Sequence, residues 1–296
     1  LLCLSSSVLA FDVLPAQAPV PANNKMSVAK IELGKQLYFD PRLSKTGSVS
    51  CNSCHNVMSG GVDNAKFSTG VGGKKGGRNS PTVWNAAFMS VQFWDGRAKS
   101  LEDQAKGPMT NPVEMAMPNH DAVVARLNQI PGYVASFDKV FGKNSLNIDN
   151  VAKAIAAYER TLITPHSPVD RFLKGDKKAL SAAAQRGMKL VQTVGCISCH
   201  SGVNYAGPSL PEGVGFYQKF PTFTDGDYVS KYNLDDDNGR YEATKQDQDK
   251  HFFRVQSWRN VALTAPYFHN GSVATLDEAV RVMAKTQLGK NLKDDE

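Results

Sequence analysis

The chain has 296 residues, of which 41% are hydrophobic, so it can bury a sizeable core and exceeds one domain of typical size. Its formal net charge is +6, but the basic residues are spread along the chain and are not interleaved with aromatic residues, which argues against nucleic acid as a partner. Beyond residues 1–22, no segment is long enough to span a membrane.

The first segment, residues 1–22, joins an apolar run to small residues and prolines. Ala16 and Ala18 give it the A-x-A form of a signal-peptidase site, so we interpret it as the tail of a secretory signal. A disordered or docking arm is the alternative interpretation. Cys3, the odd cysteine of the chain, lies in this segment.

A Cys-x-x-Cys-His pentapeptide occurs twice, as Cys51, Cys54 and His55 and as Cys196, Cys199 and His200. Two cysteines at this spacing can form thioether bonds with the two vinyl groups of one haem, while the adjacent histidine binds iron. A zinc site, a redox dithiol or a disulfide pair would not explain why histidine follows both times. The repeat therefore predicts two covalently bound c-type haems. Because bacteria attach such haems outside the cytoplasm, it also favours a periplasmic protein.

Between the two motifs, residues 60–77 are rich in glycine and polar residues. This segment is a candidate gate over a haem or a simple surface connection. Further on, Glu114 could pass protons between the oxygens of a peroxide if it lies over the iron, and Gln104 could orient the peroxide by hydrogen bonding. The alternative for both residues is a solvated surface position.

Helical periodicity dominates the remaining sequence, in stripes such as Val151, Ile155 and Tyr158, whereas strand signals are sparse. Pro165 to Pro168 form a proline-bracketed break between a helix and the approach to the second motif. We therefore predict a mainly α fold with long loops and two cytochrome c-like domains, at residues 23–165 and 166–296. The glycine- and proline-rich residues 201–250 are expected to be loop around the second haem.

The sharpest helix signal lies near the C-terminus, where Thr275 and Glu278 form a capping box. Leu276, Ala279 and Met283 then share one helix face. Methionine is a common second ligand of c-type haem iron, and it makes the centre an electron relay. We predict that Met283 is this ligand, although a core methionine would fit the same pattern.

From about Leu33 onward, the chain resembles the bacterial di-haem cytochrome c peroxidases, which are related to the MauG-type di-haem enzymes. The resemblance rests on residues 33–43, 50–56, 78–82, 92–98, 111–115 and 263–271. It implies that the first haem is the low-potential peroxidatic centre and the second the high-potential entry point for electrons. It also implies a helix beyond Glu296.

The resemblance assigns roles to further residues. Glu114 matches the catalytic carboxylate, Gln104 and Phe93 match its pocket neighbours, and Trp94 matches a tryptophan between the haems. Trp94 could also be an ordinary core aromatic. Met283 matches the family's axial methionine, whereas a tyrosine takes this position in MauG-type enzymes.

The resemblance also implies a calcium ion between the domains, at positions that match Asn79, Thr264 and Pro266. Oxygen ligands of this kind suit calcium. His269 matches a histidine near the second haem, with a structural hydrogen bond as the alternative.

In one position the chain departs from the family pattern. Most members carry a histidine in the flexible loop that caps the peroxidatic iron in the oxidised enzyme, and Val71 stands there in this chain. No histidine occurs between His55 and His120. We therefore expect the first haem to be open in the oxidised state, so that peroxide reacts without prior reductive activation; loss of function is the competing expectation.

Together, these features predict a periplasmic peroxidase that reduces hydrogen peroxide with electrons from a monohaem cytochrome c or a cupredoxin. The resemblance implies a homodimer. A di-haem electron-transfer cytochrome without chemistry of its own is the main alternative, and a MauG-type enzyme that oxidises protein side chains is a further one.

Overall fold

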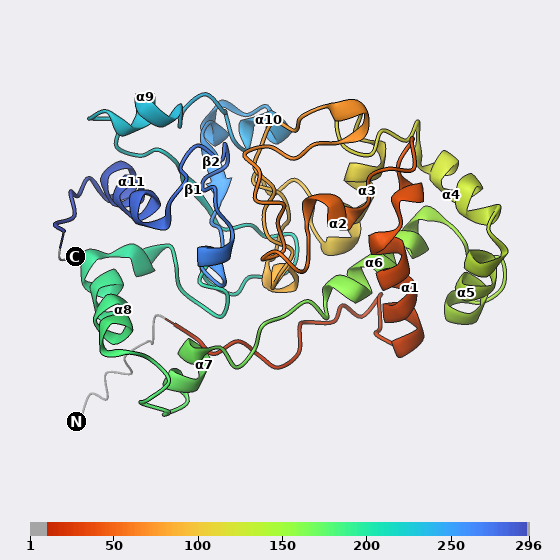
Figure 1. The fold of residues 1–296 in the computed structure, drawn as a ribbon, viewed down its shortest axis with the longest axis horizontal. Helices are drawn as coiled ribbons and strands as arrows, with labels where there is room; N and C mark the ends of the chain where they lie inside the picture. Colours follow the sequence, from red (N-terminus) through yellow and green to blue (C-terminus); the bar gives the residue numbers. More distant parts are fainter. Residues whose placement is uncertain (1–10, 295–296) are drawn as a thin grey trace.

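The computed structural model describes residues 11–294, which form two lobes side by side along the long axis (Figure 1). The first lobe contains α1 (Val28–Phe39), α2 (Cys51–Cys54), α3 (Leu101–Thr110), α4 (His120–Asn128), α5 (Pro131–Phe141) and α6 (Ile148–Glu159). The rest of the chain contains α7 (Pro168–Leu173), α8 (Ala182–Val194), α9 (Tyr228–Tyr232), α10 (Tyr241–Thr244), α11 (Leu276–Leu288), β1 (Tyr217–Lys219) and β2 (Phe252–Arg254). Several short 3-10 helices complete the fold.

The first lobe is built on the crossing of α1 and α6. A Cβ added at Gly34 of α1 would lie 1.8 Å from the carbonyl oxygen of Ala154, so only glycine allows this close approach. Leu37 and Tyr38 of α1 and Ile155 of α6 are almost fully buried at this crossing. The crossing holds together the core against which the first Cys-x-x-Cys-His motif packs.

The second lobe has a smaller core, centred on Leu234, Val273 and Val282. The strands β1 and β2 pair antiparallel, with Tyr217 opposite Arg254, and form the only sheet in residues 11–294. Trp94, which comes from the first half of the chain, packs against this second core.

The structure confirms the predicted mainly helical fold with long loops. The expected capped helix is α11, where the Thr275 side chain accepts a hydrogen bond from the backbone N–H of Glu278. Gly195 ends α8 in the left-handed conformation just before the second motif. Each lobe has its own core, and the boundary at residues 165–166 stays a prediction.

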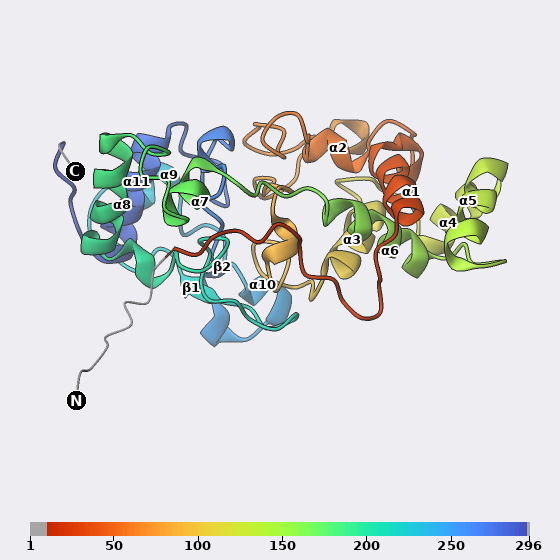
Figure 2. The same cartoon turned by 90° about the horizontal axis from the view of Figure 1, so that it is seen from below.

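Residues 11–22 run along the molecule from the second lobe toward α1 (Figure 2). Leu14 is 2% exposed, and its N–H donates to the Asp170 carboxylate at 2.9 Å. The Phe11 ring meets the Tyr205 ring edge-on. Apolar contacts and a backbone hydrogen bond therefore hold Phe11 and Leu14 in place, whereas most of residues 15–22 are exposed. The signal sequence stays a prediction, and Cys3 lies outside the described residues.

In residues 11–294, no helix combines the length and the apolar character that a membrane span requires.

Candidate haem sites

The first Cys-x-x-Cys-His motif forms the short helix α2 and the residue that ends it, His55. The His55 Nδ1 donates to the carbonyl oxygen of Pro81 at 2.9 Å, and the Tyr38 hydroxyl donates to the His55 carbonyl at 2.7 Å. Burial lowers the pKa of His55, which favours the neutral imidazole. With Nδ1 held by a carbonyl, Nε2 is the nitrogen available to iron.

The second motif repeats this arrangement with different partners. The His200 Nδ1 donates to the carbonyl oxygen of Tyr205 at 3.0 Å. The Trp258 ring stacks on the imidazole at 4.1 Å between centroids. Burial lowers the pKa of His200 to about 4, so its ring is neutral at physiological pH and can act as a ligand.

The second motif opens onto a cavity of about 420 Å³. Cys196, Cys199 and His200 line this cavity together with Met283. The cysteines of both motifs are free thiols, as thioether bonds to a haem require. Two thiols, an oriented imidazole and a thioether around one large, mainly apolar cavity fit a c-type haem.

Met283 comes to this cavity from α11. Leu276, Ala279 and Val280 of the same helix also line the cavity, so the predicted apolar face points into it. On α8, none of the side chains is fully buried, although Val191 lines the cavity. A haem in the cavity would give both helices an apolar surface to pack against.

The Glu114 side chain lies half-buried near the first motif. Burial raises the pKa of Glu114, while the charge of Arg97 and a hydrogen bond from Asn111 Nδ2 at 2.8 Å lower it. Burial also raises the pKa of the Cys51 thiol, and the charge of Glu114 adds to this effect. The structure thus brings the predicted proton-transfer carboxyl into the electrostatic field of the first haem site.

Of the two other predicted pocket residues, Gln104 lies on α3 and Phe93 lies beside this helix. Gln104 lies one turn before Gly107, and a Cβ at Gly107 would lie 3.4 Å from the Phe93 ring. Phe93 has a φ of +68°, an uncommon conformation for an aromatic residue. The Arg97 guanidinium stacks on the Phe93 ring at 3.5 Å, which connects Phe93 to the charge that acts on Glu114.

The glycine-rich segment packs against the backbone of Glu114. The Val71 N–H donates to the Glu114 carbonyl oxygen at 2.8 Å, and the Val71 side chain is 8% exposed. A Cβ at Gly70 would lie 2.1 Å from the Val113 carbonyl oxygen. The segment is therefore held on the candidate peroxide site by close backbone contact, and the valine side chain joins the core of the first lobe.

Trp94 lies at the boundary of the two lobes. Its Nε1 donates to the Asn79 carbonyl oxygen at 2.8 Å, and its side chain lines the large cavity. The Trp94 and His269 rings meet edge-on at 6.2 Å.

The three residues predicted to bind calcium line the same cavity. The Asn79 Nδ2 donates to the Ala65 carbonyl oxygen, which leaves its Oδ1 free. Within residues 11–294, no hydrogen bond reaches this Oδ1 or the carbonyl oxygens of Thr264 and Pro266. Free amide and carbonyl oxygens are suitable ligands for a hard cation. No cluster of three or more carboxylate, histidine or cysteine side chains that could hold a metal occurs in this part of the chain.

A family model described as "Di-haem cytochrome c peroxidase" matches residues 28–178. The chain is 46% identical over 289 residues to "Cytochrome c551 peroxidase" of Pseudomonas aeruginosa, covering 97% of this chain and 80% of that protein. The chain belongs to the di-haem cytochrome c peroxidase family. It is also 36% identical to "Methylamine utilization protein MauG" of Methylorubrum extorquens, over 89% of this chain and 70% of that protein.

The solved structure of a MauG-like protein associated with microbial copper homeostasis has a TM-score of 0.78 and 31% identity to this peroxidase-family chain. The alignment covers 90% of this chain and 80% of that one. Another similar fold is the diheme peroxidase BthA from Burkholderia thailandensis, with a TM-score of 0.73 and 23% identity. Membership of the family confirms the predicted resemblance and the prediction of an enzyme.

Several residues at the haem sites of this family member escaped the sequence analysis. The carbonyl acceptors at Pro81 and Tyr205 act through the backbone and have no signal in the sequence. Trp258 lies far along the chain from His200, and only the fold brings them together. Arg254 lines the same cavity, but nothing in the sequence distinguishes it from the other basic residues of the chain.

Proposed function

We propose that this chain reduces hydrogen peroxide to water with two protons and two electrons per peroxide. The electrons come from a small redox protein, such as a monohaem cytochrome c or a cupredoxin. The observation that carries the proposal is the half-buried Glu114, whose pKa is raised by burial, beside the first Cys-x-x-Cys-His motif. A di-haem electron-transfer cytochrome would have no need of a desolvated carboxyl there.

In this proposal Cys51, Cys54 and His55 would hold the first haem, whose iron would supply a binding site for peroxide and the electrons that reduce it. Glu114 takes a proton from one peroxide oxygen and returns it to the other, which becomes the leaving water. Asn111 fixes one carboxylate oxygen by its hydrogen bond at 2.8 Å. Gln104 and Phe93 shape the pocket and orient the peroxide.

The second site is proposed as the electron entry point. His200 and Met283, which line the same cavity, would both bind the haem iron there, and this would leave no position for peroxide. Trp94 gives a route for electrons toward the first site, since it lines the cavity and is anchored at Asn79 near the first lobe. A methionine rather than a tyrosine at this position favours the peroxidase over a MauG-type activity.

We further propose that the oxidised enzyme accepts peroxide without reductive activation. Val71 has no lone pair to offer iron, and its side chain packs into the core of the first lobe. The backbone contact between Val71 and Glu114 holds the segment beside the catalytic carboxyl.

The remaining proposals concern surroundings of the two sites. Asn79, Thr264 and Pro266 would hold calcium through oxygen atoms at the junction of two domains, residues 23–165 and 166–296. A periplasmic location follows from haem attachment to the two motifs, and a homodimer follows from the family resemblance.

The substitution Glu114→Gln tests the proposed role of the carboxyl. It should lower peroxide-dependent oxidation of a reduced monohaem cytochrome c by about 100-fold or more, because the amide cannot accept the proton. Glu32→Gln is the matched control, since Glu32 is exposed on α1. Both variants should keep the haem spectra of the parent protein. Unchanged turnover in Glu114→Gln would refute the assignment.

A further inference from the structure

Arg254 is a buried cation that has no carboxylate partner within residues 11–294. Arg254 is the last residue of β2, and it is only 6% exposed. The guanidinium donates from Nε to the Phe93 carbonyl oxygen at 3.0 Å and from a terminal nitrogen to Gln256 Oε1 at 3.0 Å. Both acceptors are neutral, and no carboxylate oxygen of residues 11–294 lies within 4.0 Å of the guanidinium. Burying a charge without a counter-charge is costly.

The carboxylate of Asp95, whose charge acts on Arg254, already pairs with two other cations. Asp95 accepts from Arg78 at 2.6 Å and from Arg97 at 2.9 Å. Burial lowers the pKa of Arg254 to about 10, with Asp95 and Tyr217 giving smaller opposing effects, so the guanidinium still carries its charge at physiological pH. The protein thus maintains an uncompensated positive charge at this position.

The free donors around Arg254 face the large cavity. Gln256 turns its Oε1 to the guanidinium, and its Nε2 is buried without a partner in the described part of the chain. His269 Nε2 is a second buried donor or acceptor without a partner there. Arg254, Gln256 and His269 all line the cavity that opens onto His200.

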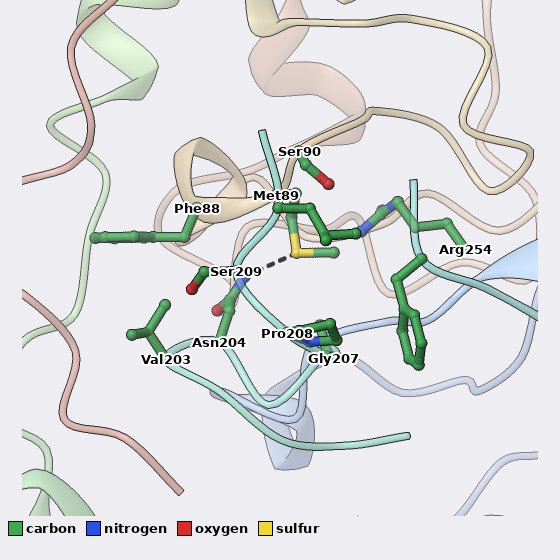
Figure 3. A pocket seen from close by; sticks show the side chains of 12 residues that line it. Phe88, Met89, Ser90, Val203, Asn204, Gly207, Pro208, Ser209 and Arg254 are labelled. Atoms are coloured by element: carbon green, nitrogen blue, oxygen red, sulfur yellow. Dashed lines mark hydrogen bonds between the residues drawn. The ribbon is translucent and has the colours of Figure 1, made fainter. Parts of the chain in front are cut away.

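A water molecule alone would not balance this site. Arg254 also lines a smaller cavity of about 20 Å³ beside Met89 and Asn204 (Figure 3). This space can hold one water, which could accept a hydrogen bond from the guanidinium. A water is neutral, however, so the charge of Arg254 would stay uncompensated. The charge of the Arg254 guanidinium and the unpartnered Nε2 of Gln256 would both be satisfied by an anion with two acceptor oxygens.

We propose that Arg254 and Gln256 bind a propionate of the haem in the large cavity and thereby fix the direction in which the ring faces. A haem carries its propionates on the edge opposite the two vinyl groups, which Cys196 and Cys199 would bind. In Figure 1, β2 lies on the side of the second lobe that faces the first lobe, and α8 lies on the outer side. The propionate edge is therefore directed toward Phe93 and Trp94, whose carbonyl oxygens accept from Arg254.

Substitution of Arg254 tests this inference, which rests on the second haem of the proposed function. In Arg254→Gln, the midpoint potential of the methionine-ligated haem should fall, because a positive charge that favours the reduced iron is removed. The propionate bending band in the resonance Raman spectrum should shift as well. Arg240→Gln is the matched control: it removes the same charge from a neighbouring arginine that pairs with Asp249 and does not line the cavity.

Equal potentials and equal Raman bands in Arg254→Gln and Arg240→Gln would overturn the inference. If Arg254→Gln does not fold and bind haem, Arg254→Lys and Gln256→Leu are measured in its place. A propionate band that is unshifted in both of these variants would also overturn the inference. The haem content of the parent protein, measured as the pyridine haemochrome, separates this outcome from failure of the proposed function. Fewer than two haems per chain would contradict the proposed function itself.

Discussion

The two Cys-x-x-Cys-His motifs have nearly the same local structure but very different surroundings. Each histidine donates its Nδ1 to a backbone carbonyl, Pro81 in the first motif and Tyr205 in the second. The first motif packs against the large core of its lobe. The second faces a cavity of about 420 Å³ that Met283 shares. The pentapeptide thus provides for haem attachment, and residues far from it provide the difference between the two sites.

The difference lies in what each lobe offers as a second group for iron. The second lobe offers a thioether on a rigid, capped helix. The first offers a half-buried carboxyl, Glu114, and a valine, Val71, neither of which is a good ligand for haem iron. We infer that the same attachment motif serves electron transfer in one lobe and peroxide chemistry in the other because of these distal residues.

The largest expected effect comes from breaking the core of the first lobe alone. In Gly34→Ala, the new Cβ would lie 1.8 Å from the Ala154 carbonyl oxygen, so α1 and α6 must move apart. We expect a loss of about 3 kcal/mol of unfolding free energy. Urea titration followed by circular dichroism measures it. Gly132→Ala, a helical glycine with no atom within 4 Å of the added Cβ, is the control and should be nearly neutral.

This substitution also tests whether the lobes are separate domains. If they are, the absorption of the methionine-ligated haem should survive at urea concentrations that unfold the first lobe of Gly34→Ala. Simultaneous loss of both haem environments would instead indicate one cooperative unit.

A smaller, more specific effect is expected from Met283→Ala. Loss of the thioether should remove the sulfur-to-iron charge-transfer band in the near infrared and lower the potential of the second haem. Donor-driven turnover should then fall, while the direct reaction of the first haem with peroxide persists. Met58→Ala, at a methionine that is 89% exposed, serves as control. A charge-transfer band that persists in Met283→Ala would show that another residue is the ligand.

The smallest expected effect concerns the pH dependence of the first site. Burial raises the pKa of Glu114, so the rate of reaction with peroxide should fall as the pH drops through a value above that of an ordinary glutamate. The charge of Arg97 lowers this pKa, so Arg97→Gln should raise it. The acid limb, which is the fall of the reaction rate on the acidic side of the pH profile, should then move to higher pH.

Stopped-flow measurements of the peroxide reaction across pH would detect this movement. Arg171→Gln removes an exposed arginine that pairs with Asp176, and it should leave the limb in place. A limb that moves equally in both variants would assign the effect to net charge rather than to Glu114.

Local patterns in the sequence predicted the parts of this molecule that local physics determines. The capping box at Thr275 gave the start of α11, and the spacing of its apolar residues gave the face that lines the cavity. The mainly helical class followed from periodicity in the same way. Apolar character alone did not decide burial, since Val28 at the first position of α1 is 78% exposed.

Contacts between distant segments could not be predicted from the sequence. The stacking of Trp258 on His200 depends on how the second lobe folds. Residues 1–22 were interpreted as the tail of a signal or as a disordered or docking arm, and nothing in the sequence indicated that Leu14 would bind Asp170, which also pairs with Arg259. The roles of Gln104, Phe93 and Trp94 came from the family resemblance rather than from spacing.

Electron paramagnetic resonance of the fully oxidised protein tests the asymmetry of the two sites most directly. We expect one low-spin signal of a histidine–methionine centre, and a second signal from a first haem that is five-coordinate or water-bound, because Val71 provides no ligand. A low-spin signal of a first haem with two histidine ligands would contradict this expectation.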